Sequence, residues 1–295
     1  MELKIEIDPK SGFCYGVVRA IDQAESYIAS HGSLYSLGDI VHNGSEIERL
    51  RDKGLETIDK STLESIKNRP VLFRAHGEPP ESYKIAKDNN LQIIDCTCPV
   101  VLKLQQRVKD AYANLKSDNG QILIYGKPGH AEVNGLIGQV GGDAIIIRNS
   151  DDLEGIDYSR PINIFSQTTK EPAEYTKICK MIQERITKAR GPIERFKAFN
   201  TICNQVSSRH PHLKEFSKRH NVIIFVSGSE SSNGKVLFEH CKSVNERSHK
   251  IEKGSEIKIE WFKDGDSVGI CGATSTPGWL LNDVAKHIEE LSHGQ

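Results

Sequence analysis

The chain repeats one pattern three times, and this repeat constrains the fold more than any other feature. Each copy has an apolar, strand-like run, then a glycine, a short polar stretch and an amphipathic, helix-like stretch; the copies are residues 34–50, 122–139 and 222–241. Self-similarity of this kind is typical of repeated structural units. Because strand-like runs alternate with helix-like stretches, the sequence predicts parallel α/β units and not a β-sandwich or a helix bundle.

Further strand-like runs accompany these copies. A second apolar run with a polar end lies at 70–81, 162–174 and 267–281, where it places His76, Thr168 and Ser275 at the end of the strand. Short additional strands are expected at 54–59 and 143–150. A last set ends at a cysteine just before a predicted helix, in residues 5–14, 91–98 and 196–203. The third repeat therefore takes its cysteine strand from the beginning of the chain.

We predict an α/β fold of three similar parallel-sheet domains related by a pseudo-threefold axis. Their boundaries are expected at 14–98, 99–199 and 200–295, with the strand in 1–13 completing the third domain. Ligands of open parallel sheets bind beyond the carboxyl ends of the strands. Because the polar stretches and the cysteines all lie at such ends, we expect them to surround one central cavity.

The composition argues against several classes of partner. The 39 basic and 40 acidic residues give a formal net charge of -1, so there is no reason to expect a nucleic-acid surface. No apolar stretch reaches the roughly 20 residues that span a bilayer, and the first ten residues alternate like a strand, unlike a signal peptide. Seven cysteines, an odd number without an export signal, indicate a reducing, cytoplasmic environment.

Three of the cysteines are candidate metal ligands. Cys14, Cys98 and Cys203 occupy matched positions, and three thiolates leave a fourth coordination position open for chemistry. Since the chain has no zinc-ribbon pair of Cys-x-x-Cys spacing, an iron–sulfur cluster with one free iron is favoured over structural zinc. The remaining cysteines are expected to be structural: Cys96, Cys179, Cys241 and Cys271.

Eight short motifs then point to a family. In order, GFCYGV, IVHN, FRAHG, DCTCP, GHAEVNG, SQTT, SSN and TSTP resemble the 4-hydroxy-3-methylbut-2-enyl diphosphate reductases, across nearly the whole chain. The resemblance implies a cloverleaf of three α/β domains around a central [4Fe–4S] cluster whose fourth iron has no protein ligand. It implies removal of the substrate hydroxyl as water by two electrons and two protons, giving isopentenyl and dimethylallyl diphosphate in the last step of the non-mevalonate route. The implied donor is a low-potential protein such as ferredoxin or flavodoxin.

The resemblance also assigns roles to individual residues. It makes Cys14, Cys98 and Cys203 the cluster ligands and Glu132 the proton relay to the substrate. The residues that match the family's substrate-binding positions are His42, His76, His130, Thr168, Ser231, Ser232, Asn233 and Ser275.

Local chemistry agrees with these roles. Serine and asparagine at 231–233 are helix N-cap types, and a helix N-terminus binds phosphate oxygens through its free N–H groups. The chain has no G-x-x-x-x-G-K-[ST] loop, so the expected anion is not a nucleotide triphosphate. Other histidines fall in polar stretches and are expected at the surface: His31, His210, His212, His220, His249, His287 and His293.

Several positions depart from the family pattern. They are Tyr15, Leu102, Gln105 and the stretch 204–207, and they affect the hydrogen bonding expected around the cluster. Three other functions stay open on the residues alone. An open-iron cluster serves equally in a non-redox dehydratase, a three-cysteine zinc site suits hydrolysis of a phosphorylated substrate, and a central cavity suits a protein that only binds an anion.

Overall fold

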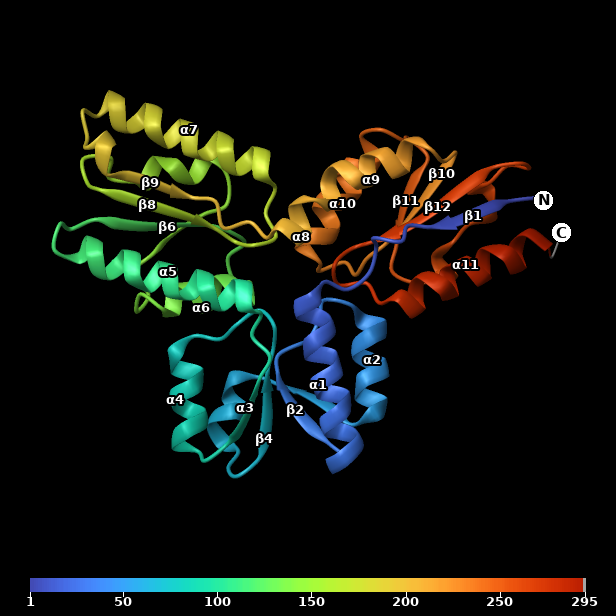
Figure 1. Cartoon of the computed structure of the whole chain (residues 1–295), viewed down its shortest axis with the longest axis horizontal. Helices are drawn as coiled ribbons and strands as arrows, with labels where there is room; N and C mark the ends of the chain where they lie inside the picture. Colours follow the sequence, from blue (N-terminus) through green and yellow to red (C-terminus); the bar gives the residue numbers. More distant parts are fainter. Residues whose placement is uncertain (294–295) are drawn as a thin grey trace. The chain divides into compact units, whose positions relative to one another are not determined.

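Three four-stranded sheets organise the protein, which is described here by a computed structural model covering residues 1–293 (Figure 1). The first sheet has the order β3 (Leu55–Ile58), β2 (Leu34–Leu37), β4 (Pro70–Phe73) and β5 (Gln92–Asp95). The second has β7 (Ile145–Ile147), β6 (Gln121–Tyr125), β8 (Ile162–Ser166) and β9 (Phe196–Phe199). The third has β11 (Ser248–Ile251), β10 (Val222–Val226), β12 (Ser267–Gly272) and β1 (Lys4–Ile7).

The three sheets share one strand order, which confirms the predicted α/β fold of three similar parallel sheets. In each sheet the short additional strand (β3, β7 or β11) lies at one edge and the strand that leads to a cysteine (β5, β9 or β1) lies at the other. The two central strands are β2 and β4, β6 and β8, or β10 and β12. The first strand of the chain pairs in parallel with β12, with Ile5 opposite Val268, so the amino-terminal strand completes the third sheet as predicted. The cysteine strand β1 nevertheless ends at Ile7, and a loop carries the chain on to Cys14.

Helices follow the strands at the predicted places. They are α1 (Tyr15–His31), α2 (Gly44–Lys53), α3 (Lys60–Ser65), α4 (Pro80–Asp88), α5 (Pro99–Lys116), α6 (Ala131–Gly138), α7 (Pro172–Lys188), α8 (Asn204–Ser207), α9 (Arg209–Lys218), α10 (Ser232–Lys242) and α11 (Gly278–His293). Proline opens α4, α5 and α7. It fits there because the first turn leaves its N–H groups without helical partners.

The central strands β2, β4, β6, β8, β10 and β12 are mostly buried on both faces, as in other parallel sheets, whereas the edge strands β1, β3, β5 and β9 are partly exposed. In the third sheet, Val222, Ile224 and Val226 pack with α11, whereas Ile223 and Phe225 pack with α9 and α10. Figure 1 shows α11 on one side of this sheet and α9 with α10 on the other. In the second sheet, α7 covers one face and α5 with α6 covers the other. In the first sheet, α3 and α4 pack through Leu63 and Ala86 against β2 and β4. Every sheet is therefore sandwiched or covered by the helices of its own repeat.

The density of internal contacts divides the chain into two compact units. One comprises Met1–Ser33, Asp39–Glu56 and Asn204–Gln295, and the other Leu34–Gly38 and Thr57–Cys203. The first unit holds the sheet of β10 and β12 together with α1 and α2, and the second holds the strands β2, β4, β6 and β8. The domain boundaries at 14–98, 99–199 and 200–295 and the threefold arrangement around a centre stay predictions.

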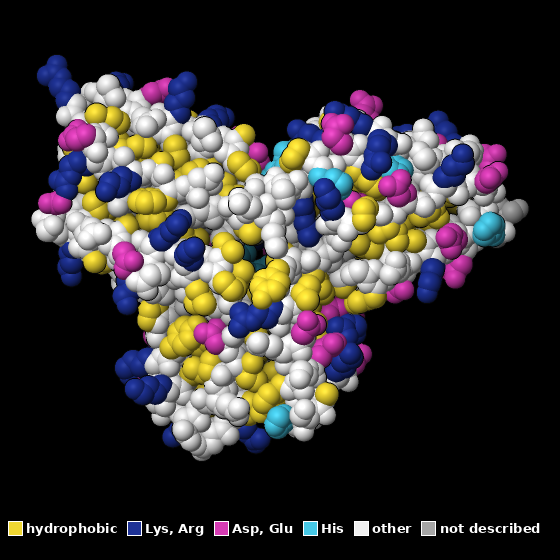
Figure 2. All heavy atoms as spheres, in the orientation of Figure 1, with side chains coloured by type: hydrophobic (Ala, Val, Ile, Leu, Met, Phe, Trp, Pro, Cys, Tyr) yellow, Lys and Arg dark blue, Asp and Glu magenta, His cyan; other side chains and the backbone are white. Residues whose placement is uncertain are grey.

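Charges of both signs are interspersed over the face shown in Figure 2. Within residues 1–293, no helix is long and apolar enough to cross a membrane. Two of the histidines expected at the surface are buried, so that prediction is wrong for them: His210 is 6% exposed and His220 is 8% exposed. The ring of His220 packs against Phe216, and its Nδ1 lies 2.9 Å from the Phe216 carbonyl oxygen. The polar residues around His210 and His220 in the sequence give no sign of this burial, because only the folded chain shows which side of α9 and of the turn after it packs inward.

Candidate active site

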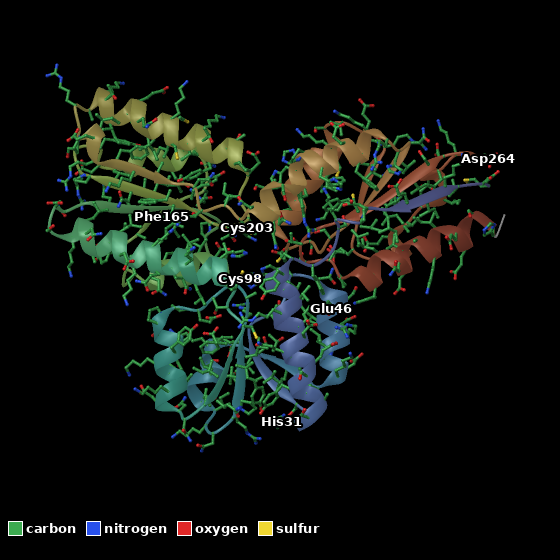
Figure 3. All side chains as sticks on the ribbon, in the orientation of Figure 1. His31, Glu46, Cys98, Phe165, Cys203 and Asp264 are labelled. Carbon is green, nitrogen blue, oxygen red and sulfur yellow. The ribbon has the colours of Figure 1, made fainter. Side chains whose placement is uncertain are left out.

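The three candidate ligands sit in one repeated backbone geometry. Each cysteine directly precedes a helix, and its N–H donates to a carbonyl oxygen just beyond the end of the neighbouring strand. The pairs are Cys98 with Ala75 (3.0 Å), Cys203 with Thr168 (2.9 Å) and Cys14 with Thr274 (3.2 Å). Figure 3 shows Cys98 at the start of α5 and Cys203 on the segment leaving β9. The repeat thus fixes the backbone at all three positions by the same hydrogen bond.

The side-chain chemistry of these positions suits an iron–sulfur cluster. Within residues 1–293 no disulfide joins any of the seven cysteines, and Cys14, Cys98 and Cys203 are only partly buried. Cys14 and Cys98 are N-cap residues of α1 and α5, where a helix N-terminus stabilises negative charge such as that of a thiolate. By contrast, Cys96, Cys241 and Cys271 are 0% exposed in the core and Cys179 lies within α7, as predicted. The donor set therefore fits a cluster held by three thiolates.

Glu132 is connected to one of these cysteines through Thr168. The Thr168 backbone N–H donates to Glu132 Oε1 at 2.7 Å, and its hydroxyl donates to Oε2 at 2.7 Å. The carbonyl of the same threonine accepts the N–H of Cys203. Glu132 is 2% exposed and Thr168 is 6% exposed, so the carboxyl is removed from bulk water. A single threonine thus positions both the candidate acid and a candidate ligand.

Burial changes the acidity of Glu132. It raises the pKa of this carboxyl to about 7, against the opposing effect of the two hydrogen bonds from Thr168. The physical reason is that the charged carboxylate loses its hydration in the interior. A carboxyl with a pKa near neutrality holds its proton in an appreciable fraction of molecules and can deliver it, which suits a general acid.

Two histidines of the same unit lie side by side. His130 is the N-cap of α6, and its Nδ1 accepts the backbone N–H of Glu132 at 3.2 Å, which places the proton of the neutral ring on Nε2. Its ring meets that of His76 edge to face, with centroids 5.4 Å apart. Gly77, the residue after His76, packs closely against Gln105: it has a φ of +75°, and a Cβ there would lie 2.7 Å from Nε2 of Gln105.

A second group of polar side chains gathers at the start of α10. Ser231 is its N-cap, and its hydroxyl accepts the N–H of Gly234 at 3.0 Å and a hydrogen bond from Ser275 Oγ at 3.1 Å. Asn233 donates from Nδ2 to Thr274 Oγ1 at 2.9 Å. Ser231, Asn233 and Ser275 are each less than a tenth exposed, and Ser232 is partly exposed. The helix start predicted for 231–233 is therefore confirmed, and with it the N-cap role of Ser231.

The start of α10 is built like the start of α6. Glu132 and Asn233 are each the second residue of their helix, and each is bonded to the threonine whose carbonyl accepts a cysteine N–H. Thr168 therefore corresponds to Thr274. The repeat in the sequence places Thr168 and Ser275 at equivalent strand ends, whereas the backbone hydrogen bonds make the preceding residue, Thr274, the counterpart of Thr168. The sequences SQT at the end of β8 and GAT at the end of β12 correspond to each other and align Thr168 with Thr274.

His42 precedes the third helix start of this kind. The next residue, Asn43, is the N-cap of α2 and accepts the N–H of Glu46 at 3.0 Å. The loop at Gly228 lies against this turn so closely that a Cβ there would be 2.6 Å from the His42 carbonyl oxygen. The polar stretches containing His42, His130 and Ser231 thus all lie at helix N-termini, as the repeat predicts.

The departures from the family pattern have contacts of their own. Gln105 is buried beside Gly77 and donates to the Glu78 carbonyl oxygen at 3.3 Å, whereas Leu102 is 44% exposed. Tyr15, which is 61% exposed, donates its backbone N–H to Oε1 of Gln205 at 3.2 Å. Two of the departures, at 15 and within 204–207, are therefore in contact with each other beside Cys14.

Comparison with known proteins gives a consistent result. The family model described as LytB protein matches residues 5–289. The 4-hydroxy-3-methylbut-2-enyl diphosphate reductase of Bacteroides fragilis is 50% identical over 287 residues, covering 97% of this chain and 98% of the relative. The reductase of the same name from Bacteroides thetaiotaomicron is 49% identical over 289 residues, covering 98% and 99%.

Two solved structures are also similar. The (E)-4-hydroxy-3-methyl-but-2-enyl diphosphate reductase described as the terminal enzyme of the non-mevalonate pathway is 30% identical with a TM-score of 0.70, covering 98% of this chain and 100% of that one. The E-1-hydroxy-2-methyl-but-2-enyl-4-diphosphate reductase from Plasmodium falciparum is 24% identical with a TM-score of 0.82, covering 98% and 87%, and it shows the fold alone. The chain therefore belongs to the LytB protein family, the family of the 4-hydroxy-3-methylbut-2-enyl diphosphate reductases, and is an enzyme of the oxidoreductase class.

Proposed function

We propose that the protein removes the hydroxyl of (E)-4-hydroxy-3-methylbut-2-enyl diphosphate by reductive dehydration. Two electrons and two protons enter, the carbon–oxygen bond breaks, and water leaves together with isopentenyl or dimethylallyl diphosphate. Relatives that match almost the whole chain carry the name of this reaction. The observation that supports it best within this chain is the buried Glu132, which is joined through Thr168 to the cysteine turn at 203.

Cys14, Cys98 and Cys203 are proposed to hold a [4Fe–4S] cluster in which one iron has no protein ligand. The repeated backbone bond of the three cysteines and their partial exposure support this proposal. When bound, such a cluster supplies electrons one at a time and a Lewis-acidic iron.

Glu132 is proposed to deliver the proton that lets the hydroxyl leave as water. Its carboxyl has a pKa of about 7 because it is buried, so it carries a proton near neutral pH. Thr168 holds both carboxyl oxygens by hydrogen bonds and thereby fixes the direction in which the acid faces. An acid held in one orientation loses little entropy when the proton is transferred.

The diphosphate is proposed to bind His42, His76, His130, Thr168, Ser231, Ser232, Asn233 and Ser275. Helices α2, α6 and α10 begin next to His42, His130 and Ser231, respectively. The N–H groups in the first turn of a helix have no partner within the helix and can bind phosphate oxygens. Histidine rings add a hydrogen-bond donor or a positive charge near physiological pH. Hydroxyl and amide groups can donate several hydrogen bonds to one phosphate without carrying charge themselves.

The proposed partners are the allylic diphosphate and a low-potential electron donor such as ferredoxin or flavodoxin, in the cytoplasm. The near balance of acidic and basic residues gives no support for a nucleic-acid partner. The non-mevalonate isoprenoid route is the proposed setting, since a similar solved reductase is described as its terminal enzyme.

An anaerobic assay tests this function directly. Protein reconstituted with iron and sulfide is mixed with the allylic diphosphate and a low-potential one-electron donor, and the two C5 diphosphates are quantified. We expect brown protein, and products that form only when the donor is present. Product formation without a donor would indicate a non-redox dehydratase, and colourless zinc protein that releases phosphate would indicate a hydrolase; either outcome overturns the proposal.

Removing the polar groups at the start of α10 should weaken substrate binding. Asn233→Ala and Ser231→Ala together remove an amide and a hydroxyl that lie within the first turn of this helix. Each lost hydrogen bond to a charged group costs about 1.5–3 kcal/mol, so the dissociation constant should rise by about tenfold or more while the cluster spectrum stays unchanged. Calorimetric titration with the substrate measures this effect.

The matched control lies at the other end of the same helix. Ser243→Ala removes a hydroxyl that donates to the His240 carbonyl oxygen at 2.8 Å, away from the α10 N-terminus. The Ser243→Ala variant should bind the substrate with the same affinity as the wild type. Equal affinities in the control and in the double variant would remove Ser231 and Asn233 from the binding site.

A further inference from the structure

The loop between β1 and Cys14 differs from the turns that carry the other two cysteines. In all three, an Asp or Asn at the strand end caps the backbone N–H two residues later. The acceptors are Asp8, Asp95 and Asn200, bonded to Lys10 (3.2 Å), Thr97 (2.9 Å) and Ile202 (3.3 Å). Cys98 and Cys203 follow directly on the capped residue, but Ser11, Gly12 and Phe13 separate Lys10 from Cys14. A longer loop has more conformations to lose and needs additional contacts to become ordered.

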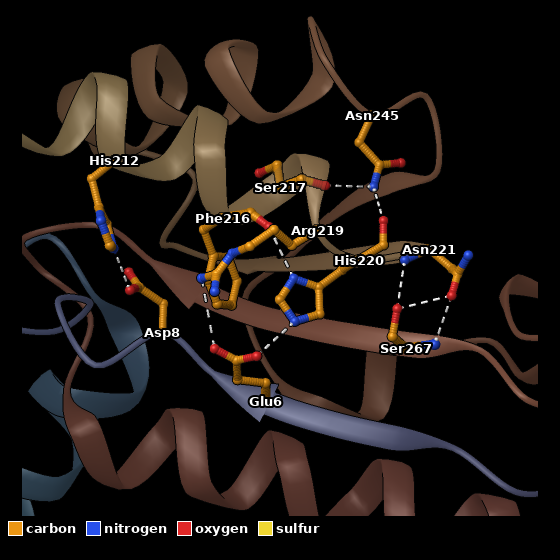
Figure 4. A network of polar contacts seen from close by, with 10 residues as sticks. All are labelled: Glu6, Asp8, His212, Phe216, Ser217, Arg219, His220, Asn221, Asn245 and Ser267. Atoms are coloured by element: carbon orange, nitrogen blue, oxygen red, sulfur yellow. Dashed lines mark hydrogen bonds and ion pairs between the residues drawn. The ribbon is translucent and has the colours of Figure 1, made fainter.

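Those additional contacts come from α9. His212 Nε2 lies 2.7 Å from Asp8 Oδ1, and since a carboxylate only accepts, the histidine is the donor (Figure 4). One turn earlier, Arg209 Nη1 donates to the Gly12 carbonyl oxygen at 2.9 Å. The Asp8 side chain is 1% exposed and that of His212 is 22% exposed, so the hydrogen bond between them is largely shielded from water. Helix α9 thus contacts both ends of the loop.

The loop is also anchored to the third sheet. Ser11 Oγ donates to Asp8 Oδ2 at 2.7 Å and accepts the N–H of Gly272 at 2.9 Å. The Cys14 N–H then donates to Thr274. Gly12 has a φ of +118°, which only glycine adopts without strain, so the chain turns sharply just before the cysteine. The Asp8 carboxyl accepts hydrogen bonds both from the loop, at Lys10 and Ser11, and from α9, at His212, and it therefore links the loop to the helix.

We propose that His212 and Asp8, supported by Arg209, are positioning residues that hold Cys14 in the orientation in which it binds the cluster. The inference rests on the proposed function, because it assigns the loop a role in holding that cluster. Without His212, the buried carboxyl of Asp8 loses its hydrogen bond to α9. A buried acceptor that loses its hydrogen-bond donor is destabilised, so the loop is expected to leave its ordered conformation while the sheets remain folded.

The test compares His212→Ala with His220→Ala. His220 belongs to the other histidine–carboxylate pair in Figure 4, in which its Nε2 lies 3.2 Å from Oε2 of Glu6, within β1 and away from the loop. Two rates are measured: hydrogen exchange of residues 8–14 in metal-free protein, and loss of cluster absorbance to a chelator in reconstituted protein. For His212→Ala we expect both to rise by about tenfold, and for His220→Ala we expect a lower unfolding temperature with both rates unchanged.

Two more variants separate positioning from general stability. His212→Gln retains a donor near the place of Nε2 and should restore slow cluster loss, whereas Asp8→Asn should resemble His212→Ala. Unchanged exchange of residues 8–14 in His212→Ala overturns the inference, whatever metal the protein binds. Faster exchange with unchanged cluster loss overturns it as well, since the loop would then not govern how Cys14 holds the cluster. Failure of the wild type to take up iron would instead refute the proposed function.

Discussion

Cys14→Ser, Cys98→Ser and Cys203→Ser are each expected to lose most of the bound iron and nearly all turnover. A hydroxyl is a poor ligand where iron needs a thiolate, and its proton is much harder to remove. Because residues that merely support a ligand already contribute roughly 10–100-fold to activity, losing a ligand itself should cost more than that. Iron and sulfide contents, measured after anaerobic reconstitution, give the result directly.

The other cysteines supply the controls. Cys96 is 0% exposed in the core and Cys179 lies within α7, so alanine at either position leaves the candidate ligands in place. Cys96→Ala and Cys179→Ala should keep their iron. Normal iron in any one of the three serine variants would remove that cysteine from the ligand set.

Glu132→Gln is expected to reduce turnover by about a hundredfold or more, the range typical of a lost general acid. Glutamine has nearly the same size and can still accept the N–H of Thr168, but it has no acidic proton to give. The cluster should stay intact and the substrate should still bind, so the loss appears in kcat and not in the dissociation constant. Near-normal turnover of this variant would assign the acid to another group, with His130 as the next candidate.

The raised pKa of Glu132 also predicts a pH dependence. Turnover needs the protonated carboxyl, so kcat should be level below about pH 7 and fall as the pH rises through that value. For stability the sign is the same: the folded state binds this proton more tightly than the unfolded chain, so the free energy of unfolding falls as the pH rises from the ordinary range of a glutamate to about 7. Glu132→Gln should lack this decline, and denaturant titrations across the pH range measure it.

Thr168→Val offers a check on the cause of that pH dependence. The threonine hydroxyl lowers the pKa of Glu132 by donating to the carboxylate, and valine has no such donor. The fall of kcat should therefore move to higher pH in this variant. A shift to lower pH, or none, would show that another group controls the profile.

The sequence by itself determined the fold of each repeat. Strands such as 34–37, 121–125 and 222–226 and the helices after them were predictable because burial on both faces and N-capping leave local patterns of apolar and polar residues. The same patterns identified the candidate ligands Cys14, Cys98 and Cys203. One cysteine before a helix indicates little, but cysteines at the equivalent position of three repeats indicate a shared role. The residues of one repeat also showed that Ser231 would begin a helix.

The tertiary structure decided the contacts that depend on distant segments. The hydrogen bond between Asp8 and His212 joins residues 204 positions apart, and no local pattern distinguishes this histidine from those at the surface. The carbonyls that accept the cysteine N–H groups likewise established the match of Thr168 with Thr274. The acidity of Glu132 is a further case, because burial depends on every segment that packs around the carboxyl, and a sequence lists those segments without placing them together.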